Sequence, residues 1–180
     1  RVMPGPDYLD SIINNWRVYS GYTNKSAKLC ENFLSTIINT NKYPLTKLSS
    51  LTASEMAKIM ENSYRAVNIA FIEEWARFSE KIGTNSFEII NAIRKRPTHN
   101  NIRQPGFGVG GYCLTKDPYF ASLSARQLFN VKNLNFPFSE LGVSTNDKMP
   151  IENIKILKKV IKTFKNKNIL LLGATYRSEV

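Results

Sequence analysis

Apolar side chains recur every three or four residues through the middle of the chain, which is the spacing of one face of an α-helix. The positions concerned are Met56, Met60, Tyr64, Val67, Phe71, Trp75, Phe78 and Ile82. Residues 52–55 have the spacing of a capping box, and Gly83 is a typical residue just beyond a helix C-terminus. The pattern therefore predicts one long helix over residues 52–82, which forms the spine of the fold.

Two polar residues of this predicted helix lie away from its apolar stripe. Lys58 and Asn62 are four residues apart and therefore share a helix face. At 3.6 residues per turn they lie roughly 150° or more from the centre of the stripe. Polar residues in such positions are commonly ordinary solvated helix positions. The helix pattern alone leaves open whether the two residues have a function.

The segment before the spine predicts a short strand and a helix. Residues 17–21 are typical of a short strand, and Thr23 or Asn24 is placed to cap the helix that follows. The apolar positions of that helix have the spacing of a buried stripe and are Leu29, Phe33, Leu34, Ile37 and Ile38.

Three further helices are predicted in the second half of the chain, so the expected fold class is mainly α. They cover residues 86–94, 118–129 and 139–163, and Pro150 is expected to interrupt the last one. The apolar run over 168–172, followed by a glycine, is typical of a buried parallel strand.

Composition restricts the class of protein. Of the 180 residues, 42% are hydrophobic, which allows a proper core for one domain of ordinary size. No apolar run reaches about 18 residues, so no transmembrane helix is expected. The two cysteines, Cys30 and Cys113, are too few for a disulfide framework and fit a reducing compartment such as the cytoplasm. The single histidine, His99, gives no basis for a zinc site.

The net charge of +11 requires an acidic partner or a well-solvated basic surface. Basic clusters at 94–96 and 155–167 fall on predicted helices, where they are typical of a solvated face. Binding to nucleic acid would instead favour a basic stripe at helical spacing with interleaved aromatic residues, and no such stripe occurs. A substrate that carries a diphosphate is an acidic partner that fits this charge.

A glycine-rich segment followed by a cysteine carries the most distinctive chemistry of the sequence. The glycines within residues 107–111 permit positive φ angles and let the backbone approach another group closely. Cys113 follows, with Lys116 and Asp117 at the opening of a predicted helix. A nearby cation and a helix N-terminus both favour the thiolate, the nucleophilic form of cysteine. A simple turn with an incidental buried cysteine is the alternative that this segment leaves open.

The spine and the cysteine segment together resemble the UDP-glucose/GDP-mannose dehydrogenase family, the nucleotide-sugar 6-dehydrogenases. That family carries a lysine and an asparagine four apart on its central helix, as at Lys58 and Asn62. It also carries a Gly-Gly-x-Cys-x-x-x-Asp segment further along the chain, as at residues 110–117. The two motifs occur here in the same order, and the pair is specific whereas neither half would be alone.

The resemblance implies NAD-dependent oxidation of a sugar C6 hydroxyl to a carboxylate, through an aldehyde and a cysteine thiohemiacetal and thioester. Cys113 matches the nucleophile, and Lys58 matches the lysine that stabilises developing oxyanions. Asn62 matches the asparagine that positions the reacting oxygen or a water, and Asp117 matches the carboxylate that assists as a base. Lys116 is the candidate contact with NAD. The candidate contacts with the nucleotide sugar are Gly108, Gly110, Gly111, Arg103 and Arg177.

The same resemblance implies a central helical dimerisation domain with remnants of two flanking Rossmann-like α/β domains. Residues 1–22 match the tail of an N-terminal NAD-binding domain, and residues 23–148 match the central substrate and dimerisation domain. Residues 149–180 match a linker helix and the first strand of a C-terminal nucleotide-sugar-binding domain. Both ends thus resemble internal positions of a longer enzyme, and no dinucleotide fingerprint follows a strand here. This piece alone is expected to be inactive.

The expected partners are a nucleotide-diphosphate sugar and a second copy of the chain. The alternative function is a non-catalytic helical dimerisation module that retains the family motif. The two hypotheses differ at Cys113, which is accessible and activated in the first and inert in the second. The lead-in at residues 104–106 and the Pro-Gly pair at residues 4–5 resemble the bacterial N-acetyl-hexosamine or mannose branches more than the animal UDP-glucose enzymes.

Overall fold

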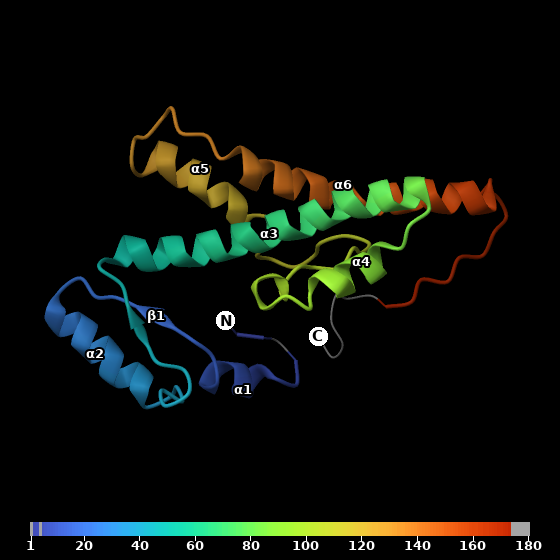
Figure 1. Ribbon diagram of the computed structural model, residues 1–180. Helices are drawn as coiled ribbons and strands as arrows, with labels where there is room; N and C mark the ends of the chain where they lie inside the picture. The colour runs from blue at the N-terminus through green and yellow to red at the C-terminus, as the bar shows by residue number, and fades with distance from the viewer. Residues whose placement is uncertain (1, 4, 174–180) are drawn as a thin grey trace. The chain divides into compact units, whose positions relative to one another are not determined.

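The computed structural model describes residues 2–3 and 5–173, which form a mainly α-helical fold (Figure 1). The described residues contain six α-helices, one short 3-10 helix and two strands of two residues each. The chain divides into two compact units, Arg1–Lys58 with Leu171–Val180 and Ile59–Leu170. The predicted fold class, a mainly helical domain around a long helix, is confirmed.

The first unit combines two short helices with a small parallel sheet. The strand predicted over 17–21 is present as β1, which pairs in parallel with β2 so that Val18 lies opposite Thr46 and Tyr19 opposite Lys47. The elements of this unit before the long helix are α1 (Tyr8–Ile13), β1 (Val18–Tyr19), α2 (Asn24–Ser35) and β2 (Thr46–Lys47).

Helix α2 begins as predicted but does not bury its apolar stripe. Thr23 Oγ1 accepts the N–H of Ser26 at 3.1 Å, and the N–H of Thr23 donates to Ser26 Oγ at 2.9 Å, which completes a capping box. Ala27 is the buried residue of α2. Of the predicted stripe, Ile38 is buried just beyond the helix, whereas Leu29 and Phe33 are exposed, so the prediction of a buried stripe is wrong for the helix itself. A sheet with two residues in each strand has too small a face to cover a helix of 12 residues.

Helix α3 (Leu51–Ile82) is one continuous helix of 32 residues and confirms the predicted spine. It ends where predicted, because Gly83 adopts a φ of +73° that lets the chain leave the helix. Its beginning differs slightly from the prediction. Ser50 Oγ accepts the N–H of Ala53 at 3.1 Å, so Ser50 rather than Thr52 provides the capping side chain. Serine and threonine are both good caps, and the sequence offers them two residues apart.

The second unit packs α6 alongside the later part of α3, and the two helices run in the same direction (Figure 1). The predicted interruption of α6 at Pro150 is wrong, because the helix continues through the proline. Residues Val143, Asn146 and Met149 are buried just before Pro150 and anchor the helix there. The other elements of this unit are α4 (Ser86–Ile93), η1 (Pro97–His99), α5 (Asp117–Gln127) and α6 (Pro137–Ile161).

Small side chains let α3 and α6 approach closely. A Cβ atom at Gly142 would lie 3.2 Å from Cγ2 and 3.3 Å from Cα of Val67, so a larger residue there would force the helices apart. Asn146 Nδ2 donates to the carbonyl of Ala66 at 3.0 Å and ties the two helices together. The buried residues of α3 are Asn62, Ala66, Ala70, Ile72, Glu73, Ala76 and Ser79.

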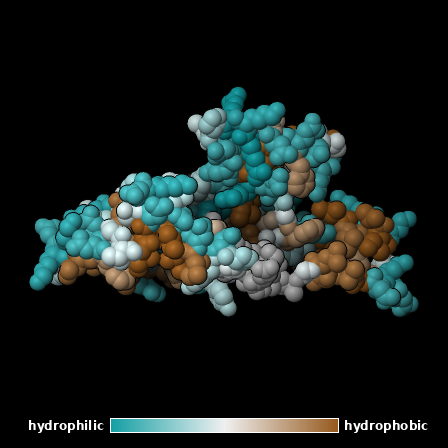
Figure 2. All heavy atoms as spheres, turned by 90° about the horizontal axis from the view of Figure 1, so that it is seen from below, coloured by the Kyte–Doolittle hydropathy of each residue, from teal (hydrophilic) through white to brown (hydrophobic). Residues whose placement is uncertain are grey.

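Most of the large apolar stripe of α3 is therefore not buried within the chain. Its members in the second unit, apart from Val67, are all more than half exposed, and they are Met60, Tyr64, Phe71, Trp75, Phe78 and Ile82. Apolar side chains form patches on the molecular surface, as the brown areas in Figure 2 show. An exposed stripe of large apolar side chains on this scale marks an interaction surface.

The apolar run over 168–172 forms no strand in the described part of the chain, so that prediction is wrong there. Leu170, Leu171 and Leu172 are more than four-fifths exposed. A strand needs a neighbouring strand to satisfy its backbone donors and acceptors, and no described strand pairs with this run.

Glu73 is a buried carboxylate whose ionisation opposes folding. It is 6% exposed, and Arg77 Nε lies 3.2 Å from its Oε1. Burial raises the pKa of Glu73 above its usual value, and the opposing attraction of Arg77 does not fully compensate. Because the pKa of Glu73 is raised in the folded state, the contribution of its protonated carboxyl to the stability of the fold is fully present below the unfolded-state pKa. It is lost as the pH rises through the folded-state value.

We therefore expect Glu73→Gln to raise the thermal unfolding midpoint by a few degrees near neutral pH, the size expected of about 1 kcal/mol. The effect is expected to shrink near about pH 4, where the wild-type carboxyl is largely protonated. Thermal melts followed by circular dichroism at both pH values test this. Glu74→Gln, the exposed neighbour on the same helix, is the control. A larger gain in acid than at neutral pH would contradict the role assigned to burial.

Candidate active site

Asn62 and Asp117 are 55 positions apart in the sequence and meet at a buried hydrogen bond. Asn62 Nδ2 donates to Asp117 Oδ2 at 2.7 Å. Asn62 is fully buried and Asp117 is 8% exposed. The interpretation of Asn62 as an ordinary solvated residue is wrong, because the face of α3 opposite the apolar stripe is the one that packs inside the unit. Two of the residues that the sequence singled out are thus in direct contact.

Lys116 binds the other oxygen of the same carboxylate. Its Nζ lies 2.9 Å from Asp117 Oδ1 and 4.8 Å from the centre of the Phe120 ring. The Lys116 side chain is 54% exposed, whereas that of Asp117 is 11% exposed. Each carboxylate oxygen therefore has a donor, one from the buried amide and one from a cation that faces solvent.

Cys113 lies in the turn that leads into α5, and it is exposed. Its carbonyl accepts the N–H groups of Lys116 at 3.3 Å and Asp117 at 2.9 Å. Thr115 Oγ1 donates to the carbonyl of Gly111 at 2.9 Å and closes the same turn. Cys113 is therefore one helical turn before the start of α5. A backbone hydrogen bond connects Cys113 to Asp117.

The glycine-rich segment has the open backbone that its composition predicted. Gly111 has a φ of +86°, which other residues rarely adopt. Gly108 has a φ of +155°, and a Cβ there would lie 3.2 Å from Cγ of Pro150 on α6. At Gly110 a Cβ would meet no heavy atom within 4 Å. The backbone of this segment is thus accessible at Gly110 and pressed against α6 at Gly108.

The remaining candidates occupy other places. Lys58 is exposed on α3, one turn before Asn62 in the helix. Arg103 is exposed in the loop after η1, and within the described residues no hydrogen bond or ion pair joins it to Asp117. Arg177 lies outside the described residues. The structure thus brings together Asn62 and Asp117, with the adjacent Lys116 and the turn of Cys113.

Sequence reasoning missed the arginines that hold these segments. Arg65 Nη1 donates to Asn62 Oδ1 at 3.3 Å. Arg94 donates from Nε and Nη2 to the carbonyl of Ile102, at 2.9 and 2.6 Å, and so fixes the loop that precedes the glycine-rich segment. The spacing of Arg65, three residues after Asn62 on a helix, could have identified the first contact. The sequence carries no comparable signal for the second contact, which joins a helix end to a loop carbonyl.

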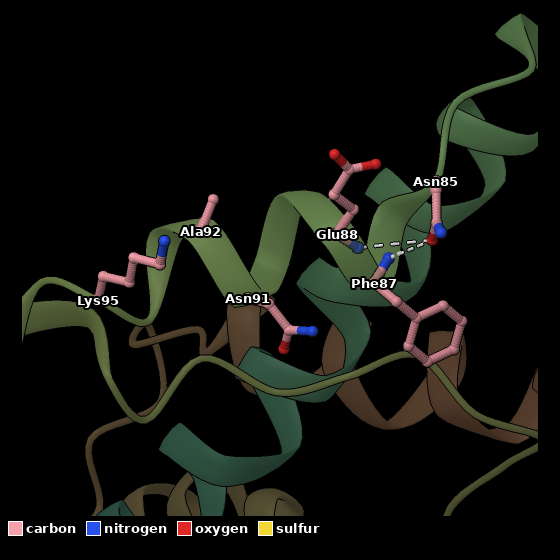
Figure 3. A pocket seen from close by; sticks show the side chains of 6 residues that line it. All are labelled: Asn85, Phe87, Glu88, Asn91, Ala92 and Lys95. Atoms are coloured by element: carbon pink, nitrogen blue, oxygen red, sulfur yellow. Dashed lines mark hydrogen bonds between the residues drawn. The ribbon is translucent and has the colours of Figure 1, made fainter.

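A hollow of about 570 Å³ beside α4 contains none of the candidate residues. It is lined by Asn85, Phe87, Glu88, Asn91, Ala92 and Lys95. Asn85 Oδ1 accepts the N–H groups of Phe87 at 3.0 Å and Glu88 at 3.5 Å (Figure 3). Asn85 therefore acts as the N-terminal cap of α4, and the hollow is no part of the group around Asp117.

Residues 52–148 match the central domain of the UDP-glucose/GDP-mannose dehydrogenase family. The match covers more than half of the chain and includes all of α3 but its first residue, the glycine-rich segment and the turn of Cys113. The buried Asn62–Asp117 pair and the helices within residues 52–148 therefore lie in the part of the chain that matches this family domain. The chain belongs to the UDP-glucose/GDP-mannose dehydrogenase family.

The chain is similar to enzymes that act on UDP-N-acetyl-D-mannosamine. The UDP-N-acetyl-D-mannosamine dehydrogenase of Methanocaldococcus jannaschii is 36% identical over 180 residues, which cover all of this chain and 39% of that protein. The structure of the UDP-D-ManNAc dehydrogenase from Pyrococcus horikoshii matches with a TM-score of 0.76 and 31% identity. It covers 90% of this chain and 36% of that one. The native UDP-N-acetyl-mannosamine dehydrogenase from Staphylococcus aureus matches with a TM-score of 0.76, at 29% identity over 100% of this chain and 39% of that one.

The chain spans about two fifths of the length of the curated relatives that it matches over its whole length. Among the described residues, no helix combines the length and the apolar character that a membrane crossing requires.

Proposed function

We propose that this chain is the central part of an NAD-dependent nucleotide-sugar 6-dehydrogenase that oxidises the C6 hydroxyl of a UDP-linked N-acetyl-hexosamine to a carboxylate. The observation that carries the proposal is the buried bond between Asn62 and Asp117 beside the turn of Cys113. Two residues that match the family motif, far apart in sequence, are in direct contact, which supports a shared role. The substrate class is that of the similar dehydrogenases, which act on UDP-N-acetyl-D-mannosamine.

The proposed reaction uses Cys113 as a covalent nucleophile. Its thiolate adds to the C6 aldehyde to form a thiohemiacetal, whose alkoxide carries the new charge. Loss of a hydride from C6 gives a thioester, and attack by water releases the carboxylate and restores the thiolate. The exposure of Cys113 suits this role, since the sulfur must be reached by substrate and water.

The neighbouring residues have distinct proposed tasks. Lys58 places a cation where the C6 oxygen becomes negative, and Asn62 positions that oxygen or the attacking water. Asp117, a carboxylate held at both oxygens, orients the water and accepts its proton. The proposed contacts with the nucleotide sugar are Arg103, Arg177 and the backbone at Gly108, Gly110 and Gly111.

NAD would supply the acceptor for both hydrides. The chain offers Lys116 to its diphosphate, and the exposed ammonium of this residue fits an anionic group. The main binding domain for NAD is proposed to precede residue 23, and the domain for the nucleotide to begin after residue 148, as the family resemblance implies. A cytoplasmic location is part of the same proposal.

A coupled assay tests the function. Enzyme that contains this chain together with the flanking domains is supplied with NAD and, in parallel, UDP-N-acetylmannosamine, UDP-glucose and GDP-mannose. We expect NADH and sugar acid from the first substrate, in a ratio of two to one. NADH without acid would contradict the covalent half of the mechanism, and acid from UDP-glucose alone would contradict the proposed substrate class.

A non-catalytic dimerisation module is the alternative. Exposure of Cys113 favours the catalytic proposal, because an inert structural cysteine is usually buried. The alternative predicts that the assembled protein forms no NADH with any of the three substrates.

The exposed stripe of α3 is the proposed dimer interface in either case. Trp75 forms ring contacts with Phe71 and Phe78, with both pairs of centroids 6.2 Å apart, and all three rings are about half exposed. With residues of α4 they line an apolar hollow of about 380 Å³. Large aromatic anchors beside an apolar hollow are typical of the centre of an interface.

We expect the chain to sediment as a dimer at micromolar concentration and Trp75→Asp to weaken the dimer by thirtyfold or more. That factor corresponds to the loss of about 2 kcal/mol, typical of an interface anchor. Phe87→Asp on α4 is the control, since Phe87 is similarly exposed but lies outside the stripe. A wild-type chain that sediments as a monomer, or equal weakening by both variants, would exclude this interface.

A further inference from the structure

Arg65 and Asp117 occupy opposite ends of the Asn62 amide. The guanidinium Nη1 of Arg65 lies 3.3 Å from Asn62 Oδ1, and Asp117 Oδ2 lies 2.7 Å from Asn62 Nδ2. An amide oxygen accepts hydrogen bonds and an amide nitrogen donates them. A reversed amide would place oxygen against the carboxylate and nitrogen against the guanidinium. The two neighbours therefore permit one orientation of Asn62.

Burial makes that orientation matter. Asn62 is fully buried, so its oxygen has little access to bulk water. A buried polar atom that loses its partner keeps the full cost of its desolvation. Removing the guanidinium would therefore take one donor from the amide oxygen and remove the cation that disfavours a reversed amide.

The effect reaches the cysteine through Asp117. The side chain of Asp117 is bound by Asn62, and its N–H donates to the carbonyl of Cys113 at 2.9 Å. A change in the orientation of the Asn62 amide thus acts on the side chain of Asp117, and the backbone N–H of Asp117 closes the turn that contains Cys113. The connection runs through three hydrogen bonds in one compact unit.

We infer that Arg65 is a positioning residue that fixes the Asn62 amide toward Asp117 and, through Asp117, the turn of Cys113. The inference rests on the proposed function for its effect on rate. The orientation of the amide itself is independent of any activity.

The kinetic test compares Arg65→Met, which keeps the length of the side chain, with Arg65→Gln, which keeps an N–H donor. We expect Arg65→Met to lower kcat about tenfold with a smaller change in KM, and Arg65→Gln to retain most of the rate. Arg126→Met, an exposed arginine on α5, is the control and should leave kcat unchanged. An unchanged kcat for Arg65→Met, or equal losses for Arg65→Met and Arg65→Gln, would overturn the inference.

A double-mutant cycle separates positioning from general structure. If Arg65 acts through Asn62, Arg65→Met should cause no further loss of kcat in the Asn62→Ala background. An undiminished tenfold loss in that background would overturn the inference.

The side-chain amide signals of Asn62 give a readout without substrate. In ¹⁵N-labelled protein we expect slow exchange for the proton bound to Asp117, and faster exchange with a shifted resonance in Arg65→Met. An unchanged signal would overturn the inference, even in a protein that shows no dehydrogenase activity. A wild-type enzyme that forms no NADH would count against the proposed function and leave the amide result to decide the role of Arg65. If Arg65→Met does not fold, Arg65→Gln and Arg65→Lys are compared by the same signals.

Discussion

Replacement of Cys113 by alanine is expected to abolish formation of the sugar acid. The variant has no sulfur to add to the aldehyde, so neither the thiohemiacetal nor the thioester can form. The first hydride transfer needs no thiol, so slow formation of NADH and aldehyde is expected to persist. The measurement follows NADH by absorbance and separates aldehyde from acid by mass spectrometry, in the protein with its flanking domains.

Two companion variants make the result specific to the sulfur of Cys113. Cys113→Ser is expected to accumulate a covalent ester, because a hydroxyl can still add to the aldehyde but its ester hydrolyses more slowly than a thioester. Intact-protein mass spectrometry detects that adduct. Cys30→Ala removes the other cysteine, which lies on α2 and is partly buried, and should leave acid formation unchanged. Acid formation at the wild-type rate by Cys113→Ala would end the covalent mechanism.

Local signals in the sequence placed the helices well. The cap at Thr23, the glycine at position 83 and the spacing of apolar residues on the spine all depend on residues within a few positions of one another. Such signals need no knowledge of the tertiary fold. The beginning of α2 and both ends of α3 were for this reason predictable to within one or two residues.

Which face of each helix packs within the chain was much less predictable from the sequence. A stripe of large apolar residues predicts a covered face, but the sequence does not say whether the chain or a partner covers it. In α3 the buried residues include small ones such as Ala66 and Ala70, and the carbonyl of Ala66 accepts a hydrogen bond from Asn146 on α6. Small residues produce little amphipathic signal, although they allow the closest helix contact.

The candidate site was predicted from the family motif, and its assembly was not. Spacing alone could not show that Asn62 would reach Asp117, because that contact depends on how α3 packs against the start of α5. The motif named both residues and the turn of Cys113. It did not include Arg65, whose contact with Asn62 becomes meaningful only when the amide is known to be buried.

Lys58→Ala is expected to lower kcat about a hundredfold with a much smaller change in KM, since an ammonium aimed at a developing oxyanion acts mainly on the transition state. Lys58 is exposed on α3, one helical turn before Asn62, where a long side chain can reach toward a substrate. Steady-state kinetics with the nucleotide sugar as the varied substrate measure both constants.

The controls test whether the charge of Lys58 acts on the reacting oxygen or is only part of a basic surface. Lys81→Ala removes an equal charge from the last turn of the same helix and should leave kcat unchanged. Lys58→Arg keeps the charge but replaces a compact ammonium with a planar guanidinium, so partial activity is expected. If Lys58→Ala raises KM and leaves kcat intact, the charge contributes to substrate binding alone. Lys58 would then have the same role as the basic residues proposed to contact the nucleotide sugar, and oxyanion stabilisation would have to come from Asn62 or the backbone around Gly110.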